Sequence, residues 1–590
     1  MITPLTGDGP APLRLRRAAG LLSPLPLLAF GVVAVVVSPL VFVGMQASQA
    51  GWDQAHRLLG RPVIATLVQH TLALSAAVTL GTAVIGFGAA YLIERTDLPG
   101  RRWWTVLLAL PLAVPEFVRG YSWVSLYPSV HGYWGAVLVM TCSLYPLVLL
   151  PVAATLRRTD GAAEEVSRSL GRGPWATLWR VTVPLTRPAL AGGALLVSLY
   201  LLGEYGAFAM LRYTTFATAI FTEYKLGFDA ASASLLTLVL VLLALLLVGL
   251  DAWAGRRGRV TRPGGGARRA APAPLGRWKL PACGALAAVV AVSLGVPLYA
   301  LGYWLVKGDS TTLPSASVWS SALTTLGYAS AAAAVSTAAA VPVALYGWRR
   351  GTRLARTAER AAYLTRALPG IAVALSVVFF AIRYAQPLYQ QPPMLVTGYV
   401  ILFFPLALTA VRAALAHVPP GVEEVARSLG TRPLAVFARV TLPLVLPGLG
   451  AAAAMVLLTA STELTATLLL RPTGTQTLAT QFWIYTSGLA YGAAAPYAAL
   501  MVLMSVPPVL LLTRRALGPV RWIWPPSARD TLFGPGERGS GACSCKAEEG
   551  GDAERRQPTT TRQMCVPDPR VPGQIHRTGP NSHPTPESSR

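Results

Sequence analysis

The sequence predicts an all-α membrane protein that crosses the bilayer about twelve times, as two parallel six-helix repeats. The 590-residue chain is 53% hydrophobic and only 13% charged. Apolar runs of about 20 residues, the length that a helix needs to cross the hydrocarbon core, recur along it. A polar segment also occurs twice at a constant offset of 259 positions, so that Glu164 corresponds to Glu423. A repeat of this length indicates a duplicated unit.

Six apolar stretches in each half define the predicted repeats. In the first repeat, 23–252, they lie near 23–45, 65–93, 104–127, 134–156, 188–211 and 232–252. In the second repeat, 279–515, they lie near 280–306, 322–347, 361–382, 394–415, 447–470 and 491–514. The polar segments, 157–187 and 416–446, each join the fourth span of a repeat to the fifth.

The remaining segments are rich in basic or polar residues. Residues 1–22 form a basic arm, and 253–278 is a linker with seven arginines and no acid. Residues 516–590 are rich in Pro, Gly, Ser and charged residues, which predicts a disordered tail. Because Lys and Arg mark the cytoplasmic side of a membrane protein, we expect the arm, the linker, the tail, both termini and both polar loops to be cytoplasmic.

Composition also limits the chemistry. The formal net charge is +25, but the basic residues lie in short loops between spans, which favours membrane lipid over nucleic acid as the partner. The five Cys and six His do not cluster at metal-ligand spacing, so no bound metal or cofactor is expected. No Gly-x-x-x-x-Gly-Lys-Ser/Thr motif occurs, so we expect no ATPase site and no catalytic residue, and the energy must come from another subunit.

Each polar loop follows the same pattern. Two acids begin a short helical run that ends at a glycine, where a helix can stop or bend sharply. A second short run follows, and a proline ends it. The residues are Glu164, Glu165, Gly171 and Pro184 in the first copy and Glu423, Glu424, Gly430 and Pro443 in the second.

This pattern resembles the EAA loop of ABC importer permeases. Val166-Ser167 and Val425-Ala426 replace the Ala-Ala pair, a mild departure. The resemblance implies a type I importer fold of the fused-dimer type, with one chain supplying both six-helix units. It also implies that the loops form coupling helices docked on a cytoplasmic ABC ATPase, expected to be a homodimer, and that an extracytoplasmic binding protein delivers the cargo. Glu165 and Glu424 would then seat the coupling helices, and the two glycines would set their bend.

Ionisable residues near the fifth span of each repeat are also duplicated. Glu204 and Arg212 correspond to Glu463 and Arg471 at the same offset. If helical, each Glu and its Arg share a face about 12 Å apart. Because charges are costly in a membrane, these four residues are candidates for a pore or gate, although each Glu is equally well explained as a structural partner of a neighbouring helix or Arg. Glu116 and Arg119 have no counterpart in the second half and favour a local ion pair.

The run 463–474 resembles the second half of ferric-iron permeases of this family. Ferric iron is therefore the favoured cargo, with thiamine, a phosphonate, a polyamine or an inorganic anion as alternatives. A proton-coupled secondary transporter and a membrane scaffold without transport are the alternatives from other classes. The Ala-, Gly- and Arg-rich composition suits a bacterial inner membrane.

Overall fold

A computed structural model describes residues 24–49, 51–159, 161–227, 229–257, 272–308, 316–419 and 421–517. Within these ranges the chain is helical, and its only β-pairing is an isolated bridge between Thr96 and Ala273. The predicted basic arm and most of the predicted tail fall outside the described residues. Helix α26 extends to Leu517, so the tail begins after this residue at the earliest.

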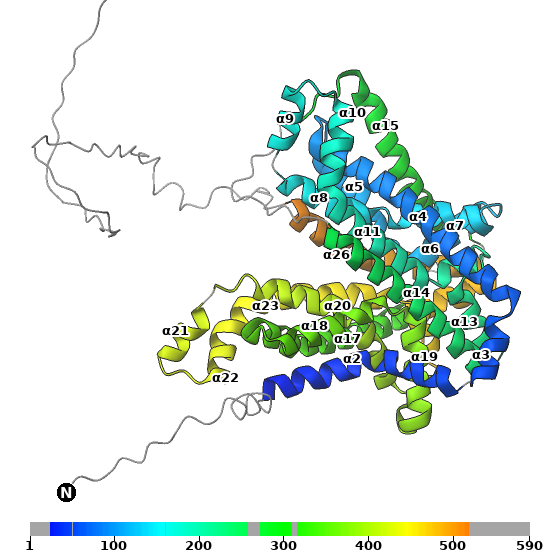
Figure 1. Cartoon of the computed structure of the whole chain (residues 1–590). Helices are drawn as coiled ribbons and strands as arrows, with labels where there is room; N and C mark the ends of the chain where they lie inside the picture. Colours follow the sequence, from blue (N-terminus) through cyan, green and yellow to red (C-terminus); the bar gives the residue numbers. More distant parts are fainter. Residues whose placement is uncertain are drawn as a thin grey trace, which may run out of the picture. The chain divides into compact units, whose positions relative to one another are not determined.

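The described residues of the first half form thirteen α-helices. Figure 1 shows how these helices are arranged. They are α2 (Pro24–Gln49), α3 (Trp52–Leu59), α4 (Pro62–Arg95), α5 (Arg101–Ala109), α6 (Glu116–Leu126), α7 (Gly132–Leu144), α8 (Pro146–Arg158), α9 (Ala162–Ser169), α10 (Pro174–Thr177), α11 (Val183–Gly203), α12 (Gly206–Met210), α13 (Phe216–Lys225) and α14 (Ala230–Arg257).

The second half repeats the scheme. Its helices are α15 (Lys279–Val290), α16 (Val296–Lys307), α17 (Ala316–Arg350), α18 (Arg353–Leu364), α19 (Gly370–Tyr384), α20 (Pro392–Leu415), α21 (Val422–Ser428), α22 (Pro433–Val436), α23 (Leu442–Ser461), α24 (Thr465–Leu470), α25 (Leu478–Ser487) and α26 (Tyr491–Leu517).

Ten helical stretches of the described chain are long and apolar enough to cross a membrane, or eleven if the bent pair α18–α19 counts as one, against the twelve predicted. The difference lies in the third span of each repeat. The predicted span 104–127 is divided into α5 and α6, and α18 and α19 meet at an angle of 106°. Pro115 and Pro369 lie at the two breaks, and the residues before them are extended. A proline removes a helical hydrogen bond and disfavours the helical conformation of its predecessor, which explains both breaks.

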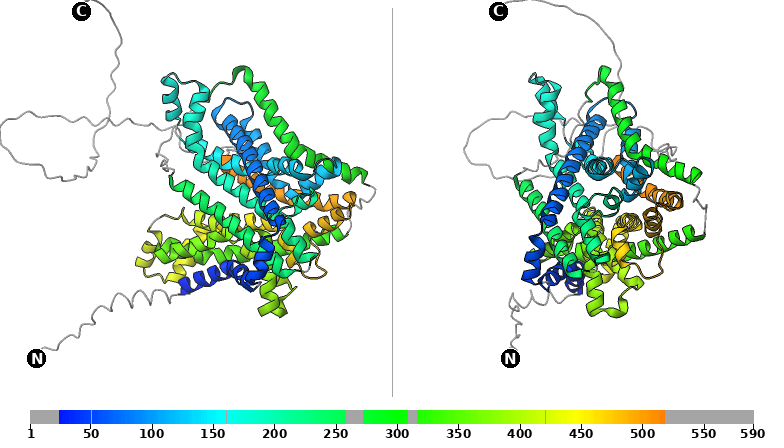
Figure 2. Two further views of the ribbon diagram at one scale, coloured as in Figure 1. Left: turned by 45° about the vertical axis from the view of Figure 1, so that its right-hand side comes forward. Right: turned by 90° about the vertical axis from the view of Figure 1, so that its right-hand side faces the viewer.

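The first span of each repeat packs against the other repeat. Helix α2 lies against α17, α18, α19 and α20, whereas α15 contacts α5 and α16 contacts α6. Figure 2 shows the dark-blue α2 beside the green and yellow helices of the second half. The buried cluster around Ala29, Val33 and Val36 includes Tyr346 and Phe404 of the second repeat. The two repeats are therefore joined by an apolar core as well as by the linker.

A short π-helical turn precedes the fifth span of each repeat at equivalent positions. These turns are η2 (Leu178–Thr182) and η7 (Phe437–Thr441), and Pro184 and Pro443 lie two residues after them. Proline has no N–H for the carbonyl four residues earlier, and the wider turn accommodates this missing bond. The turns set the direction in which the polar loops leave the fifth spans.

Candidate functional site

Each polar loop folds as two short helices separated by a glycine in the left-handed conformation. Gly171, with φ of 76°, follows α9, and Gly430, with φ of 79°, follows α21. In the first loop the N–H of Gly171 donates to the carbonyl of Arg168, and the N–H of Arg172 donates to that of Ser167. The second loop has the same two bonds, from Gly430 and Thr431. This Schellman motif ends each helix and requires a residue that tolerates positive φ.

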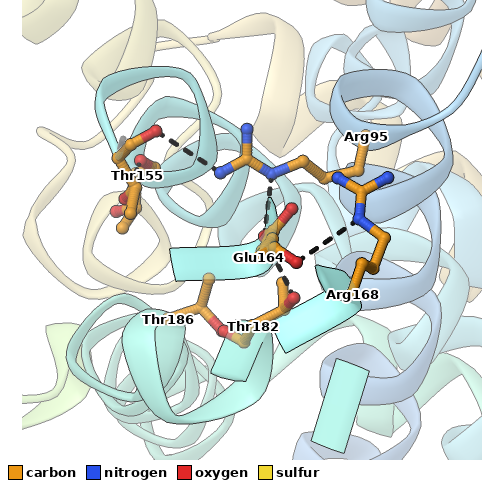
Figure 3. Close-up of polar contacts among 7 residues, drawn as sticks. Arg95, Thr155, Glu164, Arg168, Thr182 and Thr186 are labelled. Carbon is orange, nitrogen blue, oxygen red and sulfur yellow. Dashed lines mark hydrogen bonds and ion pairs between the residues drawn. The ribbon is translucent and has the colours of Figure 1, made fainter. Parts of the chain in front are cut away.

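Glu164, the first of the two adjacent glutamates of the first loop, points into the permease (Figure 3). Its side chain is buried, and its Oε1 accepts hydrogen bonds from Arg95 Nε at 3.1 Å and from Thr182 Oγ1 at 3.0 Å. Arg95 ends α4, and Thr182 lies in the π-helical turn before α11. One carboxylate therefore connects α9 to two membrane-spanning helices.

Glu423 has the same role in the second loop, with more partners. Its carboxylate accepts hydrogen bonds from Arg349 at 2.7 and 3.0 Å, from Arg427 at 2.8 Å and from Thr441 at 2.5 Å. Burial by itself raises the pKa of Glu423, but the hydrogen bonds from Arg349 and Thr441 outweigh it and hold the pKa below its usual value. Glu423 is therefore ionised at neutral pH.

Glu165 and Glu424, the acids expected to seat the coupling helices on the ATPase, are both exposed, and that role stays a prediction. The acids that anchor the loops to the rest of the chain are the preceding residues, Glu164 and Glu423. The arginines that pair with Glu164 and Glu423 were missed by sequence reasoning, although a signal existed. Arg95 and Arg349 are related by an offset of 254, as are Pro115 and Pro369, and both lie in the last turn of a long span.

Both loops expose apolar side chains at equivalent positions. Leu170 and Leu429 are 70% and 80% exposed, and Trp175 and Leu434 are exposed to a similar extent. Val166 and Val425, one turn earlier, are also exposed. A repeated patch of this kind is typical of a surface that another protein covers. We name Val166, Leu170 and Trp175 the first loop patch, and Val425, Leu429 and Leu434 the second loop patch.

The duplicated Glu–Arg segments are not continuous helices, so the predicted shared face is wrong. Helix α11 ends at Gly203, Glu204 is extended, and α12 begins at Gly206. The carboxylate of Glu204 accepts the N–H of Ala207 at 2.8 Å, and that of Glu463 accepts the N–H of Ala466 at 3.0 Å. Each Glu therefore caps the short helix that follows the break, because its side chain reaches an N–H that has no intrahelical partner.

The arginines of these segments also differ from the expectation. Arg212 has a positive φ of 53° just after α12, and Arg471 donates to the carbonyl of Thr475 at 3.2 Å. Among the described residues neither forms an ion pair with an acid. Glu204 is buried and Glu463 is half-buried, and in the described part of the chain neither is paired with its arginine.

Glu204 and Glu463 lie near each other, where the two halves meet. A Cβ atom at Gly206 would lie 2.7 Å from Leu464, so the two helix breaks are in contact. Glu116 is the third acid of the group, because its neighbour Phe117 would lie 2.9 Å from the same Cβ atom at Gly206. Glu116 accepts a hydrogen bond from Tyr200 at 2.7 Å. We name Glu116, Tyr200, Glu204 and Glu463 the acidic group.

The local ion pair expected between Glu116 and Arg119 is absent from the described structure. Arg119 is buried, and its guanidinium instead donates to the carbonyls of Pro111 and Val114. These carbonyls belong to the break between α5 and α6, where Pro115 supplies no N–H and the regular helical hydrogen bonds are interrupted. No set of three His, Cys, Asp or Glu side chains in the described ranges is arranged to hold a metal ion.

Two polar loops tied to paired repeats of apolar helices define the transmembrane component of a binding-protein-dependent importer. The chain belongs to the family described as binding-protein-dependent transport system inner membrane component, which matches residues 83–260 and 336–514. It is a multi-pass protein of the inner membrane and a transport component.

Within this family, the chain is similar to permeases of known cargo. The chain is 37% identical to the Fe(3+)-transport system permease protein FbpB 2 of Haemophilus influenzae over 81% of its own length and 95% of that protein. It is 23% identical to the ferric transport system permease protein FbpB of Actinobacillus pleuropneumoniae, over 83% of this chain and 77% of that one. The sulfate permease CysT of Escherichia coli is 27% identical over 37% of this chain and 86% of its own length.

Proposed function

We propose that this chain is the permease of an ATP-driven importer of ferric iron, with the repeats 23–252 and 279–515 forming its two halves. An extracytoplasmic binding protein delivers the cargo, and a separate cytoplasmic ATPase, a homodimer, drives alternating access. The similarity to the Haemophilus ferric permease along nearly its whole length is the observation that carries this proposal. Both termini and both polar loops face the cytoplasm, in agreement with the basic residues of the loops.

The acidic group supports a cationic cargo over an anionic one. Its three carboxylates and one phenol supply oxygen atoms, the ligands that hard cations prefer. The carboxylates come from helix breaks in both halves, and a break inside a membrane protein is tolerated where it is buried in protein or lines a cavity. We propose that the group faces the translocation path and attracts the cation weakly, which permits release to the cytoplasm. A sulfate-type cargo, by contrast, would be repelled by these carboxylates.

Coupling to ATP hydrolysis is assigned to the polar loops. We propose that the two loop patches enter grooves of the ATPase subunits, with Glu165 and Glu424 at their edges, and that Glu164 and Glu423 transmit the movement of each loop to α4, α11, α17 and α23. Pro184 and Pro443 fix the geometry at the start of the fifth spans. The chain itself carries out no covalent chemistry.

Uptake of radiolabelled ferric iron tests the cargo. In cells lacking this chain and any second iron importer, we expect uptake to fall and the intact chain to restore it. Unchanged iron uptake, together with a binding protein that co-purifies with sulfate or molybdate, would contradict the proposal and favour the anion-transport relatives. The class of protein would stand in either case, because it rests on the family.

A further inference from the structure

The segment just before α15 is attached to the end of α4. The N–H of Ala273 donates to the carbonyl of Arg95 at 2.8 Å, and its carbonyl accepts the N–H of Asp97 at 3.1 Å. The N–H of Leu275 donates to Asp97 Oδ1 at 2.8 Å, and Lys279 forms an ion pair with the same carboxylate. The side chain of Leu275 packs against the buried core of the first repeat. The last residues of the linker therefore cover the cytoplasmic end of the first repeat.

The same four residues occur near the start of the chain. Pro10-Ala11-Pro12-Leu13 repeats Pro272-Ala273-Pro274-Leu275, at an offset of 262. Both copies precede the first span of a repeat, and these spans also share Val-Val-Ala-Val, at 32–35 and 289–292, at an offset of 257. The first copy of Pro-Ala-Pro-Leu therefore lies five residues further from its span than the second copy does. The two spans themselves occupy equivalent places in the repeats. The duplication extends beyond the membrane spans to the segment that the structure shows attached in the second copy.

The second repeat has a hollow where the first repeat has this attached segment. Arg349 and Arg350, at the end of α17, correspond to Arg95 and Thr96 at the offset of 254. A cavity of about 1040 Å³ lies beside them, and its lining includes Pro24, Leu25 and Trp348. It continues along the second polar loop to Glu424 and Arg427. Because α2 begins at Pro24 on the wall of this cavity, the preceding residues of the chain start there.

We propose that Pro10–Leu13 occupies this cavity and covers the end of α17 as Pro272–Leu275 covers the end of α4. Contacts between the repeats support this equivalence. The first span of the second repeat, α15, lies on α5 of the first repeat, and the first span of the first repeat, α2, lies on the equivalent α18 of the second. Ten residues separate Leu13 from Pro24, and an extended chain of this length reaches roughly 33 Å, so the distance is no obstacle. In this arrangement Leu13 packs beside Leu25 and Trp348, and the N–H of Ala11 donates to the carbonyl of Arg349, one of the last carbonyls of α17.

The proposed contact brings the N-terminal arm against the second polar loop. The cavity is lined by Arg349 and Glu423, which form the buried ion pair that anchors this loop. In this arrangement the arm lies beside the ion pair that anchors the second loop, as Ala273 lies beside Arg95, the arginine that pairs with Glu164 in the first repeat. The inference does not depend on the cargo, since it uses only the duplication and the cavity.

Site-specific photocrosslinking of the full chain in its native membrane tests the proposal. A benzophenone side chain replaces Leu13, and a matched variant carries it at Leu275, which the structure places against the first repeat. We expect the Leu275 variant to crosslink to peptides around the end of α4. We expect the Leu13 variant to crosslink within the same molecule to 345–353 or to 416–433.

Crosslinking of position 13 to the ATPase, to a second copy of the chain, to lipid alone or to no target while position 275 reacts would overturn the proposal. A second measurement uses Ala416→Cys, an exposed residue of the cavity wall, in a chain whose own cysteines are replaced by serine. We expect deletion of residues 10–13 to increase the rate of maleimide labelling at this cysteine several-fold. An equal labelling rate with and without residues 10–13 would also contradict the proposal.

Discussion

Arg95 and Glu164 form a buried ion pair, with Nε 3.1 Å from Oε1, between the last turn of a membrane span and the first helix of a polar loop. Arg349 and Glu423 form the equivalent pair in the second half. A loop attached in this way moves with its helices, because separating a buried charged pair leaves both charges without partners. The pairs are therefore the physical basis of the proposed coupling between ATPase and permease.

Replacement of the buried acids tests this coupling. We expect Glu164→Ala with Glu423→Ala to destabilise the loops by about 3–5 kcal/mol for each broken pair and to abolish uptake while ATPase activity continues. The measurement is uptake and ATP hydrolysis by the reconstituted complex. Glu165→Ala with Glu424→Ala leaves the ion pairs intact, so any loss of uptake that it causes reports on the ATPase contact and not on the anchoring of the loops. Coupled transport by the Glu164/Glu423 variant would refute the anchoring role.

The bend between the two loop helices depends on glycine. Replacement of Gly171 and Gly430 by Val places a β-branched residue at φ near 76–79°, at a cost of about 1–2 kcal/mol or more per site. A Cβ added at either glycine would have no atom within 4 Å, so the effect is conformational and not steric. We expect the chain to reach the membrane but to hydrolyse ATP without uptake. Gly173→Ala is the control, because Gly173 has a negative φ and open space; a Val variant with normal uptake would contradict the assignment.

The two loop patches are expected to bind the ATPase through apolar contact. Leu170→Asp with Leu429→Asp places a charge in each patch, and we expect the ATPase to be lost when the permease is purified through a tag. Leu170→Met with Leu429→Met preserves the apolar surface and is the matched control. Retention of the ATPase by the Asp variant at the level of the Met variant would exclude these patches as the docking surface.

Charge and capping can be separated at Glu204 and Glu463. Gln keeps a carbonyl oxygen that can accept the N–H of Ala207 or Ala466, whereas Ala removes it. We expect Glu204→Gln with Glu463→Gln to lower iron uptake while stability is preserved. The Ala variants should lose about 1 kcal/mol of stability per cap in addition. Thermal unfolding in detergent and iron uptake are the two measurements. Full uptake by the Gln variant would show that these residues serve only as caps.

The stability of the second loop is expected to fall in acid. The pKa of folded Glu423 lies below that of an unfolded glutamate, about 4.3, so its stabilising effect is complete above that pH and is lost as the pH falls through the folded value. We expect the natural chain to unfold at a higher temperature than Glu423→Gln at pH 7 and the difference to shrink below about pH 4. A difference that stays constant from pH 7 to pH 3.5 would contradict this linkage.

The sequence by itself determined the class of the protein, the helical fold and the two loops, because hydrophobic length and exact repetition are properties of the chain alone. It also predicted the helix-ending glycines, since a Schellman motif is local. The tertiary structure decided which acid of each Glu-Glu pair faces inward, because Glu164 and Glu165 differ only in the direction of their side chains relative to Arg95 and Thr182. It also showed that the segments after Glu204 and Glu463 break, and that the third spans are divided at Pro115 and Pro369. The choice of the inward acid and the breaks at Glu204 and Glu463 depend on packing between segments far apart in the sequence, which no local pattern specifies. The prolines of the third spans, by contrast, are a local signal for a break.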